Sequence, residues 1–176
     1  MKMMTRDLSE PYPIYTYRYF VHQWPHLTLI AEHDGKTIGT IVSKLDNHKN
    51  KNCTRFRGYI AMLSVEPEYR RIGLGRELVK RSIDLMIEAD CEEVMLETET
   101  TNIAALKLYE SFGFIRDKRQ LSYYLNGVDA FKLKLLIKWR YHEKGIYLWY
   151  YNLNIFKALA RFKLTNFKFE GFWGFG

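Results

Sequence analysis

The residues with the clearest chemical potential form a glycine-rich turn, Arg70-Arg71-Ile72-Gly73-Leu74-Gly75. An apolar run, residues 59–65, precedes the turn, and a helical pattern, residues 76–89, follows it. Glycine lets the backbone approach a ligand closely, and the unpaired N–H groups that open a helix attract anions. The spacing therefore predicts a phosphate-binding turn. The alternative is an ordinary loop with basic surface residues, since no Gly-Lys-Ser/Thr of the common P-loop follows.

Glu97 is the candidate general base. It lies in residues 92–99, where a strand between two helical segments should be buried on both faces and apolar throughout. A carboxylate there costs free energy unless it lies at the end of the strand or has a task. The alternative is that the strand ends at Leu96 and that solvent surrounds Glu97.

Asn102 and Tyr109 are seven residues apart on one expected helix, residues 103–112, and so share a face. A phenol on a face beside a cleft could protonate a leaving group. The alternative is that Tyr109 only packs, as most helical tyrosines do.

Other aromatic residues could form the walls of a groove. Tyr123 and Tyr124 fall on an expected strand, which places one ring on each face, so that one of them faces the groove. A second wall could come from Glu10, Tyr12 and Tyr15.

The pattern of cysteines and histidines excludes several classes of enzyme. The two cysteines match neither a disulfide framework nor a metal site, and no Ser/His/Asp or Cys/His arrangement is evident. We therefore expect neither covalent nor metal catalysis. No signal-peptide pattern and no membrane-spanning run is evident, which predicts an intracellular, cytoplasmic protein.

Composition predicts one globular domain followed by a basic tail. Of the 176 residues, 47% are hydrophobic, enough for one domain with a sizeable core. The net charge is +7, and residues 138–176 contribute +5 of it, so residues 1–137 are nearly neutral. The tail interleaves 13 aromatic residues with basic ones. We expect it to be disordered or to form an interface with a partner protein, a membrane surface or RNA.

The order of the expected elements is helix, β, β, β, α, β, α, β, β, which predicts a single mixed α/β domain. Thr16 and Asn102 are the expected helix caps, and Asp34-Gly35 signals a hairpin. Residues 1–9 carry no expected element, and residues 46–55 are expected to form a flexible loop. The strands are expected at residues 27–31, 37–45, 56–65, 92–99, 114–124 and 128–137, and the first helix begins at residue 16.

Two motifs resemble the signatures of the GNAT acetyltransferases. One is Arg70-x-x-Gly73-x-Gly75, and the other is Asn102-x-x-Ala105-x-x-Leu108-Tyr109-x-x-x-Gly113-Phe114. Further runs resemble the catalytic subunits of NatC-type N-terminal acetyltransferases, between residues 7 and 137. They are Leu8-Ser9-Glu10-Pro11-Tyr12, Tyr17-Arg18-Tyr19-Phe20, residues 57–63, residues 96–99 and residues 123–130.

The resemblance implies a GNAT fold and acetyl-CoA as the donor, with no metal. The catalytic residues that it implies are Glu97, as a base acting through water, and Tyr109, as the acid. It implies CoA contacts from Met62, Leu63, Val65, Arg70, Arg71, Gly73, Leu74, Gly75, Asn102 and Tyr109. It implies acceptor contacts from Glu10, Tyr12, Tyr59 and Tyr124. An N–H group near Leu63 is the candidate donor to the oxyanion.

The resemblance also implies an acceptor and partners. The acceptor is a nascent protein N-terminus, preferably methionine followed by a bulky hydrophobic residue, and the partners are the NatC auxiliary subunits near the ribosome. Family members usually begin with a strand for which the six residues before Asp7 leave no room, so we expect residues 1–137 to form a domain without it. The extension 138–176 matches nothing in the family. The alternatives are a GNAT that acetylates lysine or a small amine, and a non-catalytic module that binds CoA or RNA.

Overall fold

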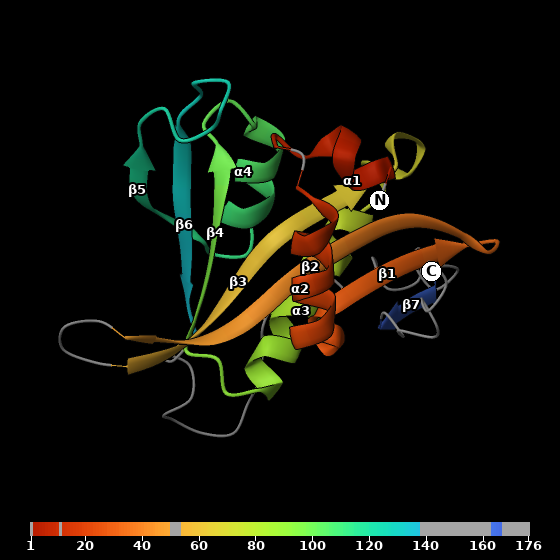
Figure 1. Cartoon of the computed structure of the whole chain (residues 1–176), viewed down its shortest axis with the longest axis horizontal. Coiled ribbons are helices and arrows are strands. Elements are labelled where there is room, and N and C mark those ends of the chain that lie inside the picture. Colours follow the sequence, from red (N-terminus) through yellow and green to blue (C-terminus); the bar gives the residue numbers. More distant parts are fainter. Residues whose placement is uncertain (1, 11, 50–53, 138–162, 167–176) are drawn as a thin grey trace.

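The computed structural model describes residues 2–10, 12–49, 54–137 and 163–166. Their strands form a seven-stranded sheet in the order β5-β6-β4-β3-β2-β1-β7 (Figure 1). The strands are β1 (Thr28–His33), β2 (Lys36–Lys49), β3 (Thr54–Val65), β4 (Glu93–Glu99), β5 (Ile115–Gln120), β6 (Ala130–Leu136) and β7 (Lys163–Asn166). The helices are α1 (Lys2–Asp7), α2 (Ile14–Gln23), α3 (Leu74–Glu88) and α4 (Ile103–Glu110), with 3₁₀ turns η1 (Pro25–Leu27) and η2 (Pro67–Tyr69).

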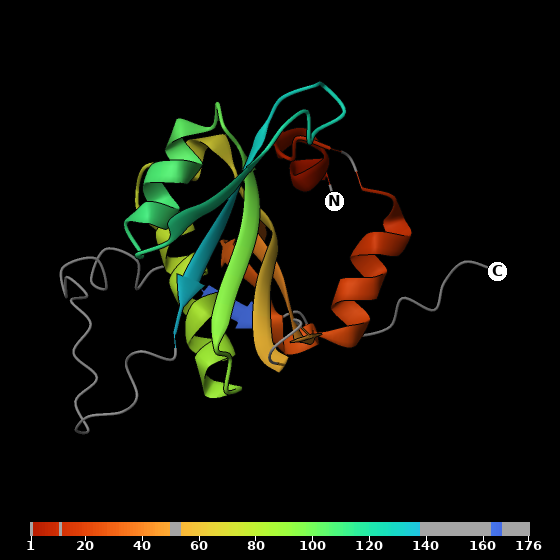
Figure 2. The same cartoon turned by 90° about the vertical axis from the view of Figure 1, so that its left-hand side faces the viewer.

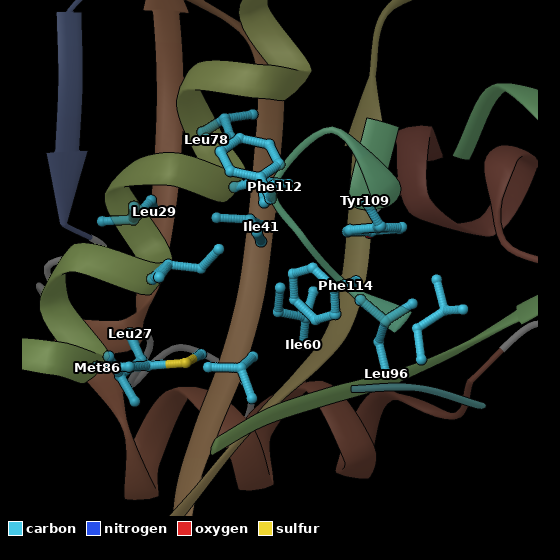
Figure 3. Close-up of a cluster of buried hydrophobic side chains, with 14 of the residues drawn as sticks. Leu27, Leu29, Ile41, Ile60, Leu78, Met86, Leu96, Tyr109, Phe112 and Phe114 are labelled. Atoms are coloured by element: carbon cyan, nitrogen blue, oxygen red, sulfur yellow. The ribbon is translucent and has the colours of Figure 1, made fainter. Parts of the chain in front are cut away.

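Helices cover both faces of the sheet, with α3 and α4 on one side and α2 on the other (Figures 1 and 2). The apolar residues of α3 recur at helical spacing, and Leu78, Val79 and Met86 are fully buried. They pack with residues of β1, β2 and α4 in the larger of two hydrophobic clusters (Figure 3). The smaller cluster joins α1 and α2 to the opposite face and consists of Met4, Tyr17, Phe20, Val42 and Met62.

The central strands β3 and β4 separate halfway along their length. Their parallel pairing covers only Arg57–Tyr59 opposite Glu93–Met95. Directly after it, the register between β2 and β3 shifts, because Ser43 faces Ile60 while Val42 faces Met62. Ala61 is thus an extra residue, a β-bulge, and a bulge bends its strand. The bulge accounts for a gap between β3 and β4 that side chains line.

The predicted mixed α/β domain is confirmed, and most elements lie close to their expected positions. The Asp34-Gly35 hairpin is confirmed, with both residues at positive φ (50° and 72°), as a tight two-residue turn requires. The expected flexible loop at 46–55 was wrong in part, since β2 extends to Lys49 and β3 begins at Thr54. Polar residues are tolerated there because the paired ends of β2 and β3 extend beyond the core.

Two further expectations at the N-terminal end were wrong. Residues 2–7, for which no element was expected, form α1, whose Met3 and Met4 are buried. Helix α2 begins at Ile14 with Pro13 as its N-cap residue, so Thr16 lies inside the helix and does not cap it. Pro13 has the fixed φ of proline (−65°) and an extended ψ (155°), the non-helical conformation that an N-cap residue usually adopts.

The edge of the sheet is formed by a strand that the sequence pattern did not indicate. Lys163–Asn166 pairs antiparallel with Leu29–Glu32 of β1. The described residues before β1 contain helices and no strand. The rest of the extension, 138–162 and 167–176, lies outside the described residues, so its disordered or interface-forming character stays a prediction.

Candidate active site

The gap between β3 and β4 opens into a pocket of about 430 Å³, within the usual range for small-molecule sites. Its walls come from both halves of the sheet, from the segment between α1 and α2, from α4 and from the loop between β5 and β6. The lining residues are Asp7, Leu8, Ser9, Glu10, Tyr12, Tyr59, Ile60, Ala61, Met62, Leu63, Leu96, Glu97, Thr98, Asn102, Ala105, Tyr109, Tyr123 and Tyr124.

The pocket brings together most of the residues that the sequence nominated. Both candidate catalytic residues, Glu97 and Tyr109, line it, and so do all four candidate acceptor contacts. Of the candidate CoA contacts, Met62, Leu63 and Asn102 join Tyr109 there. The remaining candidate CoA contacts do not line this pocket and lie between the end of β3 and the start of α3. They are Val65, Arg70, Arg71, Gly73, Leu74 and Gly75.

Glu97 lies within β4, so the alternative in which the strand ends at Leu96 was wrong. Its side chain is half-buried beside the Tyr59 ring. Burial of that ring, the Glu97 charge and a hydrogen bond to Glu97 together raise the pKa of Tyr59. Tyr59 is therefore a neutral phenol beside the carboxylate.

Tyr109 comes from the buried face of α4, where 5% of the residue is exposed and the ring packs edge-to-face on Phe114 (Figure 3). Burial raises the pKa of Tyr109. The phenol therefore keeps its proton at neutral pH, which a general acid requires.

Three more tyrosines surround the pocket mouth. Burial raises the pKa of Tyr12, and the nearby charges of Glu10 and Glu97 raise it further. Burial likewise raises the pKa of Tyr124, with smaller contributions from Tyr123 and the nearby carboxylates. Tyr123 and Tyr124 lie in the loop after β5 and stack edge-to-face at 5.1 Å. The expectation of a strand with one ring on each face was therefore wrong, because both rings line the pocket.

The glycine turn has the conformation that its sequence suggested. Gly73 is the N-cap residue of α3 at φ 94°, a left-handed conformation that favours glycine, and no side chain caps the helix. The N–H groups of the first turn of α3 thus remain available to an anion. Arg71 (φ 65°) is exposed, whereas Arg76 donates to Ser111 and stacks on Phe112, away from the turn.

Asn102 is the N-cap of α4, as predicted, and its Oδ1 accepts a hydrogen bond from the Ala105 N–H at 3.1 Å. The side chain is exposed at the edge of the pocket. A contact with CoA therefore has to use its amide nitrogen or share the capping oxygen.

Sequence reasoning missed Asp7 as a lining residue. Its carboxylate contacts Ser64 and Arg70, which are 57 and 63 positions away in the chain. The only local signal was an acidic residue directly before the Leu8–Tyr12 run, which is too weak to nominate a site.

Within the described part of the chain, no helix is long and apolar enough to cross a membrane.

Residues 1–114 match the acetyltransferase (GNAT) family. The chain is 59% identical to N-alpha-acetyltransferase 30 of Xenopus laevis over 138 residues, which cover 78% of this chain and 50% of that protein. It is 55% identical to N-alpha-acetyltransferase 30 of Saccharomyces cerevisiae, covering 76% of this chain and 77% of that protein. The chain thus spans about half the length of the frog protein, and 37% of the length of the human one.

The fold is also shared with solved acetyltransferases. A crystal structure of the NatC complex bound to Gag peptide and CoA contains a chain that superimposes with a TM-score of 0.73 at 53% identity, covering 77% of this chain and 87% of that one. Chaetomium thermophilum Naa20 in complex with a bisubstrate analogue gives a TM-score of 0.71 at 27% identity, covering 81% and 85%.

Proposed function

Because the chain belongs to the acetyltransferase (GNAT) family, and within it to the N-alpha-acetyltransferase 30 proteins, we propose that it transfers the acetyl group of acetyl-CoA to protein N-termini. The observation that carries this proposal is the pocket in the β3–β4 gap, which holds Glu97 and Tyr109 together. The glycine turn at the end of β3 suits the pyrophosphate of the donor.

The proposed reaction follows from the positions of these groups. The Glu97 carboxylate takes a proton from the α-ammonium group, directly or through one water molecule, and the neutral amine attacks the thioester carbonyl carbon. A C–N bond forms, the C–S bond breaks, and the nitrogen of the new amide releases its second proton to water. The leaving thiolate takes its proton from the Tyr109 hydroxyl, which is then restored from solvent.

The pocket also suits the acceptor class. A protein N-terminus is a cation until it loses a proton, with a pKa of about 7.7–8.0, so it needs only a modest base. The carboxylates of Glu10 and Glu97 and the faces of nearby tyrosines attract such a cation. Tyrosine rings also pack well against a thioether, which supports methionine as the first residue, followed by a bulky hydrophobic one.

The cellular setting is part of the same proposal. A chain of the NatC complex shares this fold at 53% identity. We propose that this protein likewise works with NatC auxiliary subunits, in the cytoplasm and near the ribosome, on nascent chains. Pull-down of the auxiliary subunits by the full chain would support this assembly, and their absence from the complex would contradict it.

The test of the activity compares three peptides in an assay of CoA release. A peptide that begins Met-Leu should react, the same peptide with a blocked N-terminus should not, and a blocked peptide containing lysine should not. Replacement of the base, Glu97→Gln, should lower kcat about 10²- to 10⁴-fold, the usual contribution of a positioned acid–base group. Equal reaction of the blocked lysine peptide would favour a lysine acetyltransferase. CoA binding without any transfer, in the presence of the auxiliary subunits, would favour a non-catalytic module.

A further inference from the structure

Asp7 joins three separate parts of the fold at one carboxylate. Its Oδ1 accepts from Arg6 at 2.7 Å, and its Oδ2 accepts from the Ser64 hydroxyl at 2.6 Å and lies 2.8 Å from Arg70 Nη2. Asp7 is the last residue of α1, Ser64 lies near the end of β3, and Arg70 opens the glycine turn. One side chain therefore connects the acceptor side of the pocket with the expected pyrophosphate turn.

The Asp7 carboxylate is largely buried, while the side chains of its partners Arg6 and Arg70 are 45% and 47% exposed. The Asp7 side chain is 12% exposed, and Ser64 is buried. Burial raises the pKa of Asp7, but hydrogen bonds from Arg6, Ser64 and Arg70 outweigh it and lower this pKa to about 2. The carboxylate is thus fully charged at neutral pH, and charge-assisted hydrogen bonds are among the stronger ones in proteins.

Arg70 is fixed by this carboxylate and by the backbone. Its Nε donates to the Val65 carbonyl at 2.8 Å while its Nη2 lies against Asp7. These two contacts hold the Arg70 guanidinium at the protein surface, whereas Arg71 has no side-chain partner among the described residues. Arg70 sets the path of the chain into the turn, and Arg71 is the cation left for a ligand.

The segment that begins at Asp7 is also held at its other end. The Glu10 carboxylate accepts a hydrogen bond from the Leu125 N–H at 2.9 Å, in the loop between β5 and β6. Residues 7–10 therefore span the pocket from the β3 half of the sheet to the β6 half. A shift at Asp7 would move the acceptor wall and the glycine turn together.

We propose that Asp7 is a positioning residue that holds the glycine turn, through Arg70, in the geometry that binds the CoA pyrophosphate, and holds the acceptor segment in register with it. The inference rests on the proposed function, because it assumes that this turn binds CoA. It assigns Asp7 no contact with the reacting atoms.

The test is calorimetric binding of CoA to the full chain, without acceptor, followed by steady-state kinetics. Asp7→Asn weakens the interaction with Arg70, and the Kd for CoA should rise about tenfold, the effect of one charge-assisted hydrogen bond. The KM for acetyl-CoA and the KM for the acceptor should both rise, while kcat should change less than about threefold, since Glu97 and Tyr109 are untouched. A merely structural role would lower the melting temperature and leave these constants unchanged in the folded protein.

Asp117→Asn is the matched control. Asp117 also pairs with a cation, Lys134, at 3.1 Å, but it is exposed on β5 and does not line the pocket. This variant should keep the Kd for CoA. An equal loss in both variants, or an unchanged Kd in folded Asp7→Asn, overturns the inference.

A double-mutant cycle covers the case in which Asp7→Asn folds poorly. Arg70→Gln alone should weaken CoA binding, and Ser64→Ala should weaken it slightly, because the hydroxyl also orients the carboxylate. Added to Arg70→Gln, the Asp7 change should cost less than about threefold in CoA affinity, since the partner is already lost. Fully additive losses contradict the inference. If the wild-type chain binds no CoA at all, the proposed function fails first.

Discussion

The tyrosines around Glu97 form an uncharged polar lining. Burial, strengthened by the carboxylate charges, raises the pKa values of Tyr12, Tyr59, Tyr123 and Tyr124 above the usual value near 10. A phenolate in this pocket would lie close to Glu97, which disfavours ionisation. The acceptor ammonium therefore meets hydroxyl groups and carboxylates, and no cation from these side chains.

This lining predicts the pH dependence of the reaction. The value of kcat/KM should rise with pH as the acceptor amine loses its proton, up to about pH 8, and should not fall before about pH 10. The sign follows from the raised pKa values, because a group with a higher pKa keeps its proton to a higher pH. Initial rates measured from below pH 8 to about pH 10, with circular dichroism to confirm folding, check this pH dependence. A decline near pH 9 in folded protein would contradict it.

The two glycines at the start of α3, Gly73 and Gly75, have different conformations and therefore different roles in the turn. Gly73 has positive φ, so any side chain there is strained. Gly75 lies in the helix, and an added Cβ would meet only Val65, at an ordinary 3.8 Å. The fold therefore needs glycine at the first position and tolerates alanine at the second.

We expect Gly73→Ala to lower the free energy of unfolding by about 1–2 kcal/mol, the cost of a left-handed residue with a side chain. It should also weaken CoA binding, because the turn must relax. Gly75→Ala should leave the melting temperature nearly unchanged. Thermal unfolding and CoA titration of both variants check the pair. A larger loss of stability in Gly75→Ala than in Gly73→Ala would contradict this account.

The β3 bulge shows why the pocket could not be located from sequence alone. Strand β3 was expected from its apolar run, and Glu97 was conspicuous because a carboxylate interrupts an otherwise apolar strand. Nothing in the run through Ala61 marks it as the extra residue, since a bulge depends on the register with β2. The cap at Asn102 was predictable because a helix cap is a local interaction.

The features that the sequence could not predict depend on contacts between segments that are far apart in the chain. Short segments without a clear period, such as residues 2–7 and 163–166, take their structure from the surfaces on which they pack. The Asp7–Arg70 contact is of the same kind. The local pattern of apolar runs, turns and caps, in contrast, predicted the order of the elements. The family motifs predicted most of the residues that line the pocket in the structure, because each motif combines a local structure with a chemical group.

The edge strand β7 should contribute to the stability of the sheet. A chain ending at Ile137 lacks β7, which leaves the backbone groups of β1 unpaired along that edge. The free energy of unfolding should fall by about 2 kcal/mol, the worth of a few backbone hydrogen bonds. The KM for acetyl-CoA should stay within about twofold, because β1 does not line the pocket. Urea unfolding and kinetics check both parts.

Proline substitutions provide the matched control in the full-length chain. Neighbouring residues of a strand point their N–H groups to opposite sides, so one of Leu164→Pro and Thr165→Pro must remove a donor to β1. That variant should lose part of the same stability. If truncation and both prolines leave the urea midpoint unchanged, β7 contributes nothing to the sheet.

The short pairing between β3 and β4 has a consequence for motion. Three residue pairs join the two halves of the sheet, and beyond Tyr59 neither strand has the other as a partner. Backbone amides that face this gap are shielded from water only when something fills it. The hydrogen-exchange rates of these amides should therefore slow on ligand binding, while the rates of amides between β1 and β2 should change little. Hydrogen exchange at the gap would thus measure how much of the protein has ligand in the pocket.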